Sequence, residues 1–241
     1  MIKQAIEKIV ELAGMQPISY AGCVFVRDNE GGIVQLRTEL DMPEVLGVNS
    51  LDALVELLRH GDPLPNLGTI YVSVKAHDRV NVFSEMRSDL RCLRCDLYAA
   101  ASKDVPGWDA EVRLPFDQAA VALMTRFQES EDREYALRLL SQITTGAKVT
   151  YADNGIASTI VMQKGAALAE NVTIRPLVKL RPYRTFQEVE QPEGIFLIRI
   201  DERGITFTEA DGGMWKLTAR KTVKAWLEKE LEGLENVVVM L

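Results

Sequence analysis

The chain has 241 residues, of which 47% are hydrophobic and 26% are charged, and its formal net charge is −7. This composition is that of an ordinary globular protein with a sizeable core. The negative net charge argues against a protein whose whole surface binds duplex DNA, because nonspecific affinity for DNA comes from neutralising its phosphates. The sequence has neither an apolar run long enough to span a membrane nor the start of a signal peptide, so we expect a cytoplasmic protein.

The N-terminal part is predicted to run from a helix through a hairpin to a second helix. Apolar residues at helical spacing predict a helix over residues 2–13. β-Rich runs at 22–27 and 33–37 flank a turn rich in Asn and Gly, which predicts a hairpin. Ser50 is a typical N-cap for the second helix, and Gly61 follows its last apolar residue.

Strands are predicted next. Apolar and polar residues alternate from Thr69 to Val74, a second strand contains Val80 and Val82, and a third lies near 90–98. Their close spacing predicts an antiparallel meander with helices over one face. His77 and Asp78 resemble a base and its orienting carboxylate, but sequential neighbours at a turn seldom face one another, so we assign them no catalytic role.

A helix hairpin is predicted in the middle of the chain. Pro115 suits the first turn of one helix, while Ser130 caps the next and Gly146 ends it. The fold class is therefore α+β, with antiparallel sheets built from a meander and hairpins, a central helix hairpin and flanking helices. We expect a single unit over 1–241, with subdivisions at 1–110, 111–146 and 147–241.

The C-terminal part returns to strands. Asp153-Asn154-Gly155 is a strong hairpin turn, and strands are predicted at 195–200 and 205–209. A last helix is followed by an apolar strand at 237–241, which should close a sheet or pair with another subunit. We therefore expect a homo-oligomer.

The stretch from Asn171 to Arg184 has the strongest local charge bias, with four cations and no acid. Its two prolines favour an edge strand or an ordered loop, on which Lys179 and Arg181 share one side. Guanidinium groups bind phosphate, and a nearby aromatic ring can stack on a base. The predicted ligand-binding residues are Arg175, Lys179, Arg181, Tyr183, Arg184 and, as a second stacking surface, Trp215.

The same cations have an ordinary structural interpretation. The following segment contains Glu188, Glu190 and Glu193, and opposite charges commonly pair across a hairpin. The sequence leaves open whether the basic segment binds a ligand or is paired with these three carboxylates.

Catalytic motifs are absent from the sequence. We find no phosphate-binding loop, dinucleotide fingerprint, nucleophile elbow, zinc-protease motif or calcium loop, so an enzyme is the less expected class. Cys92 and Cys95 lack the second half of a zinc site, and strand alternation sends them to opposite faces. We expect no metal, no cofactor and no catalytic residues.

Several runs in the C-terminal half point to one family. They are Val149-Thr-Tyr-Ala-Asp-Asn-Gly155, Gln163-Lys-Gly165, Leu180-Arg-Pro-Tyr-Arg-Thr-Phe186, Glu188-Val-Glu-Gln-Pro-Glu193 and Glu209-Ala-Asp-Gly-Gly-Met-Trp215. Over residues 147–230 the chain resembles proteins encoded in phages and prophages, common in those of Gram-positive bacteria and distantly similar to the YfdQ-type prophage family. The resemblance implies a setting in the early region of a temperate phage genome, and no activity to carry over.

This setting and the basic segment together suggest a function. We expect a phage-encoded, non-enzymatic counter-defence protein that sequesters a small phosphorylated or nucleotide immune signal in the host cell cytoplasm. A recombination or replication accessory that binds single-stranded DNA or a protein partner is one alternative. An inhibitor of a host enzyme is another. Duplex DNA and membranes are not expected partners.

Overall fold

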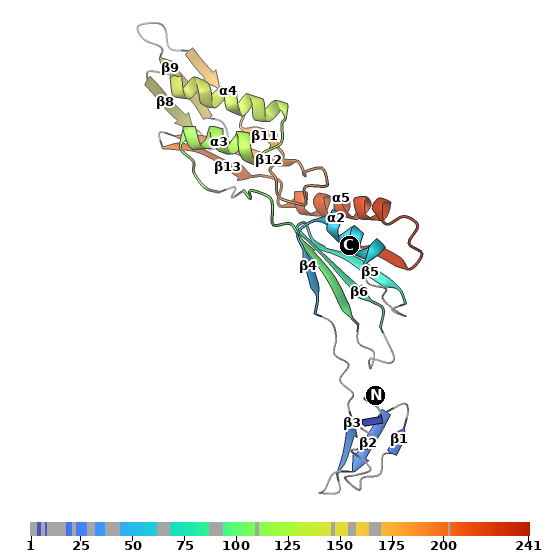
Figure 1. The fold of residues 1–241 in the computed structure, drawn as a ribbon. Coiled ribbons are helices and arrows are strands. Elements are labelled where there is room, and N and C mark those ends of the chain that lie inside the picture. Colours follow the sequence, from blue (N-terminus) through green and yellow to red (C-terminus); the bar gives the residue numbers. More distant parts are fainter. Residues whose placement is uncertain are drawn as a thin grey trace. The chain divides into compact units, whose positions relative to one another are not determined.

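The computed structural model describes most of the chain, namely residues 4–5, 8, 18–20, 23–27, 32–36, 44–61, 68–86, 94–108, 111–145, 148–153, 158–163, 170–201 and 203–241. Its contacts divide the chain into two compact units, Met1–Pro43 and Glu44–Leu241. The fold is mixed α+β with antiparallel sheets, as predicted (Figure 1). The division at Pro43 is not one of the subdivisions expected from the sequence.

The first unit contains a three-stranded antiparallel sheet in the order β1-β2-β3. Its strands are β1 (Ile18–Tyr20), β2 (Cys23–Arg27) and β3 (Ile33–Leu36). The pairing of β2 with β3, from Val24↔Leu36 to Arg27↔Ile33, confirms the predicted hairpin. Gln4, Ala5 and Lys8 are helical, and the other residues of the expected 2–13 helix lie outside the described part of the chain.

The largest sheet of the second unit has five strands in the order β14-β5-β6-β7-β4. Its strands are β4 (Leu46–Val48), β5 (Ile70–Ala76), β6 (Arg79–Ser84), β7 (Asp96–Ala101) and β14 (Val237–Met240). The middle strands β5, β6 and β7 form the predicted antiparallel meander. The two outer strands run parallel to their neighbours, β14 beside β5 and β4 beside β7. In the chain, α2 follows β4 and α5 precedes β14, so a helix adjoins each of these strands.

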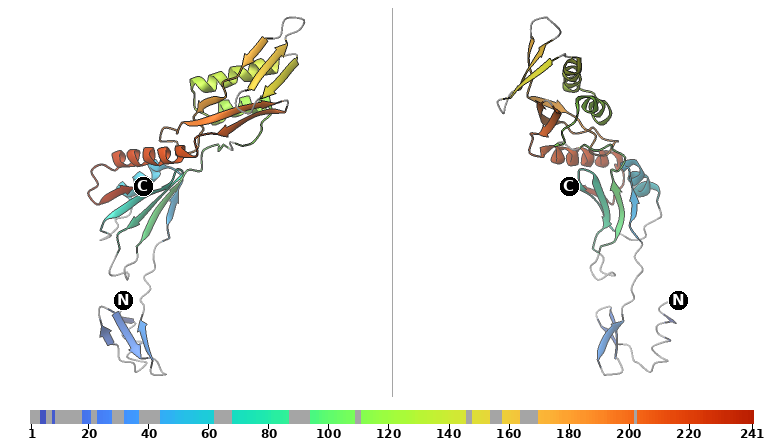
Figure 2. Two further views of the ribbon diagram at one scale, coloured as in Figure 1. Left: turned by 180° about the vertical axis from the view of Figure 1, so that it is seen from behind. Right: turned by 90° about the vertical axis from the view of Figure 1, so that its left-hand side faces the viewer.

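Helices α2 (Leu51–His60) and α5 (Met214–Glu230) pack on this sheet (Figure 2). Ser50 caps α2 by accepting a hydrogen bond from the Ala53 N–H at 3.2 Å, as predicted. Alternate residues of the meander enter the shared core, which contains Val72, Val74, Val80 and Val82, all with no exposed surface. The final strand β14 joins the edge of this sheet beside β5.

One prediction for this sheet needs correction. The third strand, expected near 90–98, begins at Asp96 and runs to Ala101. Three alanines at 99–101 have weak intrinsic strand preference, but pairing with β6 and β4 overrides it. Residues 90–93, and with them Cys92, lie outside the described part of the chain, while Cys95 is buried in the core.

A second core lies between helices and a three-stranded antiparallel sheet. The sheet has the order β11-β12-β13, and its strands are β11 (Leu177–Leu180), β12 (Gly194–Asp201) and β13 (Gly204–Glu209). Helices α3 (Phe116–Arg126) and α4 (Glu131–Thr145) supply the other side of this core. Their arrangement as a central hairpin stays a prediction.

The remaining sheet is antiparallel, in the order β10-β9-β8. Its strands are β8 (Lys148–Asp153), β9 (Ser158–Gln163) and β10 (Glu170–Thr173). The register Asp153↔Ser158 agrees with the hairpin expected around Asn154 and Gly155, although these turn residues lie outside the described part of the chain.

Candidate functional site

The structure places five of the six predicted ligand-binding residues in two groups and Tyr183 in neither. Strand β11 alternates between exposed and buried residues, so Lys179 faces solvent while Val178 and Leu180 enter the core. This strand lies at the edge of its sheet, as the prolines predict. Beyond it the chain turns inward, and Arg184 is buried together with Trp215.

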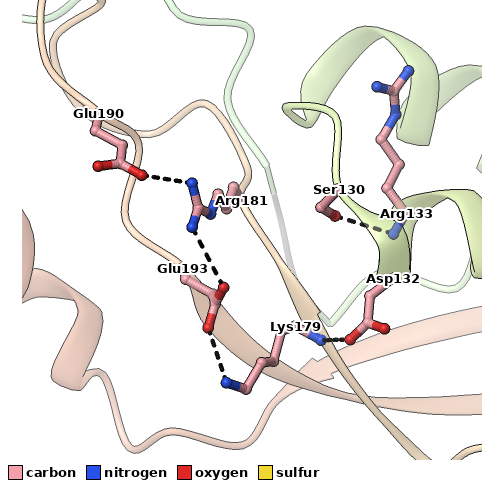
Figure 3. A network of polar contacts seen from close by, with 7 residues as sticks. All are labelled: Ser130, Asp132, Arg133, Lys179, Arg181, Glu190 and Glu193. Atoms are coloured by element: carbon pink, nitrogen blue, oxygen red, sulfur yellow. Dashed lines mark hydrogen bonds and ion pairs between the residues drawn. The ribbon is translucent and has the colours of Figure 1, made fainter.

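The outer group, which we call the paired strip, consists of three cations and three carboxylates: Arg175, Lys179, Arg181, Asp132, Glu190 and Glu193. Arg175 lies 3.1 Å from Asp132, and Lys179 lies 3.3 Å from Glu193. Arg181 lies 2.5 Å from Glu190 and 3.7 Å from Glu193 (Figure 3). Every cation of the strip therefore has a carboxylate partner.

Helix α4 positions one end of the paired strip. Ser130 accepts a hydrogen bond from the Arg133 N–H at 3.1 Å, which caps the helix and places Asp132 in its first turn (Figure 3). The Asp132 carboxylate also accepts the backbone N–H of Lys179 at 2.6 Å. The Arg175 guanidinium lies 4.1 Å from the centre of the Tyr135 ring. The strip thus joins α4 to the edge strand β11.

Three carboxylates were predicted as alternative partners for the basic segment, and two of them form ion pairs with its cations. Glu190 and Glu193 pair with the cations, whereas Glu188 does not. The Glu188 carboxylate instead accepts the backbone N–H of Leu51 at 2.5 Å and that of Asp52 at 3.3 Å. It therefore satisfies donors at the start of α2.

The inner group, which we call the Arg184 cluster, consists of His77, Arg184, Glu209, Trp215 and Lys216. The Arg184 guanidinium carbon lies 3.6 Å from the centre of the Trp215 ring, and its Nη1 lies 2.5 Å from Glu209. The Trp215 indole N–H donates to the other Glu209 oxygen at 3.2 Å. The His77 ring meets the Trp215 ring edge to face at 4.7 Å, and the Lys216 Nζ lies 5.6 Å from its centre.

Two turns bring these residues together. Glu209 ends β13, and the following turn reaches Gly213, the N-cap of α5, whose φ of 79° suits glycine. Asp211 accepts the Gly213 N–H at 3.0 Å, which confirms the structural role of this turn. His77 lies in the turn between β5 and β6, where its carbonyl accepts the Thr185 hydroxyl.

Buried Gln191 fixes the loop that carries Arg184. Its side-chain oxygen accepts the backbone N–H groups of Arg184 at 3.0 Å and Thr185 at 3.2 Å. Its amide nitrogen donates to the Phe186 carbonyl at 2.9 Å. Tyr183, half-buried, precedes this point, and its backbone N–H donates to the Arg126 carbonyl at 2.9 Å. The loop conformation is therefore set by backbone contacts.

Arg184 is the most unusual charged residue of the described chain. Its side chain is only 8% exposed, and burial lowers its pKa to about 10, although Glu209 and Asp211 act in the opposite direction. Its Nε and Nη2 are buried without a hydrogen-bond partner among the described residues. Buried donors of a charged group are normally satisfied, so these two nitrogens call for an explanation.

Charges of both signs act on the Arg184 cluster. The pKa of His77 is lowered, first by burial and then by the charges of Lys216 and Arg184, while Asp78 raises it. The first turn of α5 contains no acidic residue and no side-chain cap, although the positive end of the helix dipole lies there. The two cations and the helix N-terminus favour an anion, and the carboxylates of Glu209 and Asp211 oppose it.

No group of three or more His, Cys, Asp and Glu side chains among the described residues could hold a metal ion. His60 is exposed on α2 and lies 3.9 Å from Glu56. No helix in the described ranges is both long and apolar enough to cross a membrane.

Sequence reasoning identified Arg184 and Trp215 but missed the partners that surround them. Glu209 and Lys216 flank the Asp211-Gly-Gly turn, which was interpreted only as a turn. His77 was set aside because its sequence neighbour Asp78 is a poor orienting group. No local sequence pattern predicts that this turn and the loop at Arg184 come into contact.

No protein-family model matches the chain, and no curated protein and no solved structure matches it significantly. The resemblance to phage and prophage proteins thus stays a prediction.

Proposed function

We propose that this protein is a non-enzymatic binding protein that takes a small phosphorylated or nucleotide ligand at the Arg184 cluster. The observation that supports it is the buried Arg184 guanidinium with two unpartnered nitrogens. A phosphate oxygen is the acceptor that such a group binds best, because the pair of N–H donors matches its geometry.

The surroundings of Arg184 suit such a ligand. Lys216 is exposed in the first turn of α5, where it adds a positive charge to the helix N-terminus. The Trp215 ring is buried, with the Arg184 guanidinium over it and the His77 ring beside it, so a base stacks on it only when these side chains move. The two unpartnered nitrogens are covered, so a phosphate reaches them only when neighbouring side chains move. Because Trp215 lies on the guanidinium, binding should change its fluorescence.

The paired strip is the weaker candidate for the same ligand. Its three cations already have carboxylate partners within 4.0 Å, so an incoming phosphate must compete with fixed negative charges. We therefore assign Arg175, Lys179 and Arg181 to the structure of the β11 edge, and we keep only Arg184 and Trp215 from the sequence-based ligand-binding set.

In the phage setting implied by the resemblance, we propose that the ligand is a host immune nucleotide which the protein sequesters in the host cell cytoplasm. Sequestration needs tight binding and no turnover, and the cluster offers charge and stacking without a nucleophile beside a base. A homo-oligomer belongs to the same proposal, with the edge strands β14 and β11 as pairing surfaces. Mass photometry of the purified protein measures its oligomeric state, and a monomer would contradict this part of the proposal.

The test of the ligand is thermal melting with inorganic phosphate, linear and cyclic nucleotides and ADP-ribose derivatives. A ligand at about 100 times its Kd stabilises the folded state by roughly 2.7 kcal/mol, or about 5–10 °C for a chain of this size. We expect Lys216→Ala to reduce the shift. Lys221→Ala, at an exposed lysine farther along α5, is the matched control and should leave it unchanged.

Three results would count against the proposal. The first is that no compound raises the melting temperature of the wild-type protein by more than a degree. The second is a Lys216→Ala variant that responds like the wild type. The third is an equal change of intrinsic fluorescence in wild type and Trp215→Phe, which would show that the ligand does not bind at Trp215.

A further inference from the structure

The five-stranded sheet has a second face that the helices do not use. Strand residues alternate between faces, so the neighbours of the buried valines point away from the α2 and α5 core. These second-face residues are Tyr71, Ser73, Lys75, Arg79, Asn81, Phe83, Val238 and Met240. Val238 is 46% exposed and Met240 is 39% exposed, and the Tyr71 and Phe83 rings are partly exposed. The two ends of this face and its β14 edge are therefore accessible, whereas Ser73 between the ends is only 9% exposed.

One end of this face carries an aromatic pair with an arginine. Tyr71 and Phe83 are cross-strand partners, and their rings stack at 5.6 Å with an interplanar angle of 26°. The exposed Arg94 places its guanidinium carbon 5.4 Å from the centre of each ring, and its Nη1 donates to the Ser84 carbonyl at 3.1 Å. Rings and guanidinium together form a flat, cationic stacking surface.

The other end carries two cations. Lys75 and Arg79 lie on either side of the β5–β6 turn, both are exposed, and neither has an ion-pair or hydrogen-bond partner for its side chain in the described structure. Tyr71 and Lys75 are four residues apart, which is about 13 Å along a strand. Acids also lie near this face: Asp78 in the turn, Asp96 as the register partner of Phe83, and Glu85, whose carboxylate accepts the backbone N–H of Thr69 at 3.1 Å.

We propose that this sheet face binds single-stranded nucleic acid. Bases stack on the Tyr71 and Phe83 rings beside Arg94, and the backbone phosphates pass Lys75 and Arg79. The charges favour this occupant over an apolar peptide, because a peptide strand would leave Lys75 and Arg79 without counter-charges. The accessible Val238 and Met240 extend the platform onto β14. The site shares no residue with the Arg184 cluster, although Lys75 and Arg79 flank the turn that contains His77. Its occupant does not depend on the ligand of that cluster.

The experiment measures fluorescence anisotropy of labelled oligo(dT) and oligo(rU) at several salt concentrations. Tyr71→Leu with Phe83→Leu keeps apolar side chains but removes stacking, and should weaken binding at least tenfold. Lys75→Ala with Arg79→Ala should lower the slope of log K against log salt by about 1.4, the value for two lost phosphate contacts on a single strand. Circular dichroism melting checks that both variants fold.

The matched control is Arg199→Ala with Lys221→Ala, which removes two exposed cations from β12 and α5 and should change neither affinity nor salt slope. Lys216→Ala should bind oligonucleotides with the affinity of wild type. A negative result at the sheet face therefore does not refute the Arg184 cluster, and a negative result at the cluster does not refute the sheet face. Three outcomes would overturn the proposal. They are no binding of the wild type at low salt, an equal loss in the control, or binding of acidic peptides alone, which would assign the face to a protein partner.

Discussion

The paired strip and the Arg184 cluster use the same residue types in opposite environments. In the strip, Arg175 is 55% exposed and Lys179 is 64% exposed, and each has a carboxylate within 4.0 Å. In the cluster, Arg184 is 8% exposed, and its single carboxylate leaves two nitrogens without partners. The strip satisfies its charges where water would satisfy them anyway, whereas the cluster leaves a charge incompletely satisfied where water does not reach.

The difference shows that the density of cations along a sequence is a poor guide to a binding site. The strip contains three of the four cations that made the segment conspicuous, yet exposed ion pairs contribute little free energy in either direction. Arg184 alone has a strong energetic reason to attract an anion, because removing a charged donor from water is costly.

The largest effect should come from breaking the pair inside the cluster. Glu209→Ala removes the carboxylate that pairs with Arg184 and accepts the Trp215 N–H, so a buried charge loses its ion-pair partner. We expect the free energy of unfolding to fall by about 3–5 kcal/mol. Urea denaturation followed by circular dichroism measures it.

The matched change in the strip is Glu193→Ala, which should lower the free energy of unfolding by about 1 kcal/mol or less. Equal losses for Glu209→Ala and Glu193→Ala would erase the contrast between the two regions. The double variant Arg184→Met with Glu209→Met should be less destabilised than the sum of its single changes, because no unpaired charge is left.

Gly194 tests how tightly the cluster is packed. A Cβ at this position would lie 2.5 Å from the Arg184 Nη2 and 3.1 Å from the Phe196 ring. Gly194→Ala should therefore lower the free energy of unfolding by about 1–3 kcal/mol. Gly47→Ala, where a Cβ meets nothing within 4 Å, is the control and should stay within about 0.5 kcal/mol of wild type. A harmless Gly194→Ala would mean that Arg184 has room to move aside.

The helix that supports the strip can be weakened without touching any of its ion pairs. Ser130→Ala removes the N-cap of α4 and should lower the free energy of unfolding by about 1 kcal/mol. Ser130→Asp keeps a capping oxygen and should retain the stability of wild type. The same urea titration reports both, and a loss of similar size in Ser130→Asp would show that the hydroxyl acts through something other than capping.

Salt distinguishes the two regions. Lys179→Ala should lower the free energy of unfolding by about 0.2–1 kcal/mol at low salt, and this loss should disappear at 1 M salt, because exposed pairs are screened. The loss caused by Glu209→Ala should persist at 1 M salt. Thermal melting at 0.05 and 1 M salt measures both, and a Lys179→Ala loss that survives high salt would contradict the surface character of the strip.

The smallest effect concerns pH. Burial and the charges of Lys216 and Arg184 lower the pKa of His77, so between this lowered value and 6.5 the unfolded chain binds more protons than the folded protein. Stability should therefore decrease as the pH falls through 6.5. Urea denaturation between pH 5 and 7.5 should show a shallower decrease of the free energy of unfolding for His77→Gln than for wild type. Identical profiles would show that His77 does not cause the decrease.

Much of the secondary structure could be predicted from local pattern. Ser50 and Gly61 bound α2 because capping and chain termination are decided by neighbouring residues. The alternation in β11 placed Lys179 outward and Leu180 inward before any tertiary contact was known, since a strand has a side-chain period of two. The strand at 96–101 was misplaced because its alanines acquire strand geometry only from their neighbours.

The candidate site depended on contacts that no local pattern contains. The order of residues shows that Arg184 is a cation near a tyrosine and that Trp215 follows a glycine turn. The folding of the whole chain buries Arg184 on Trp215 with Glu209 and His77, while Lys179 and Arg181 stay at the surface. Burial is a property of the whole packed chain, and the free energy of a charge depends on how much water surrounds it, so the same arginine has different chemistry in the two places.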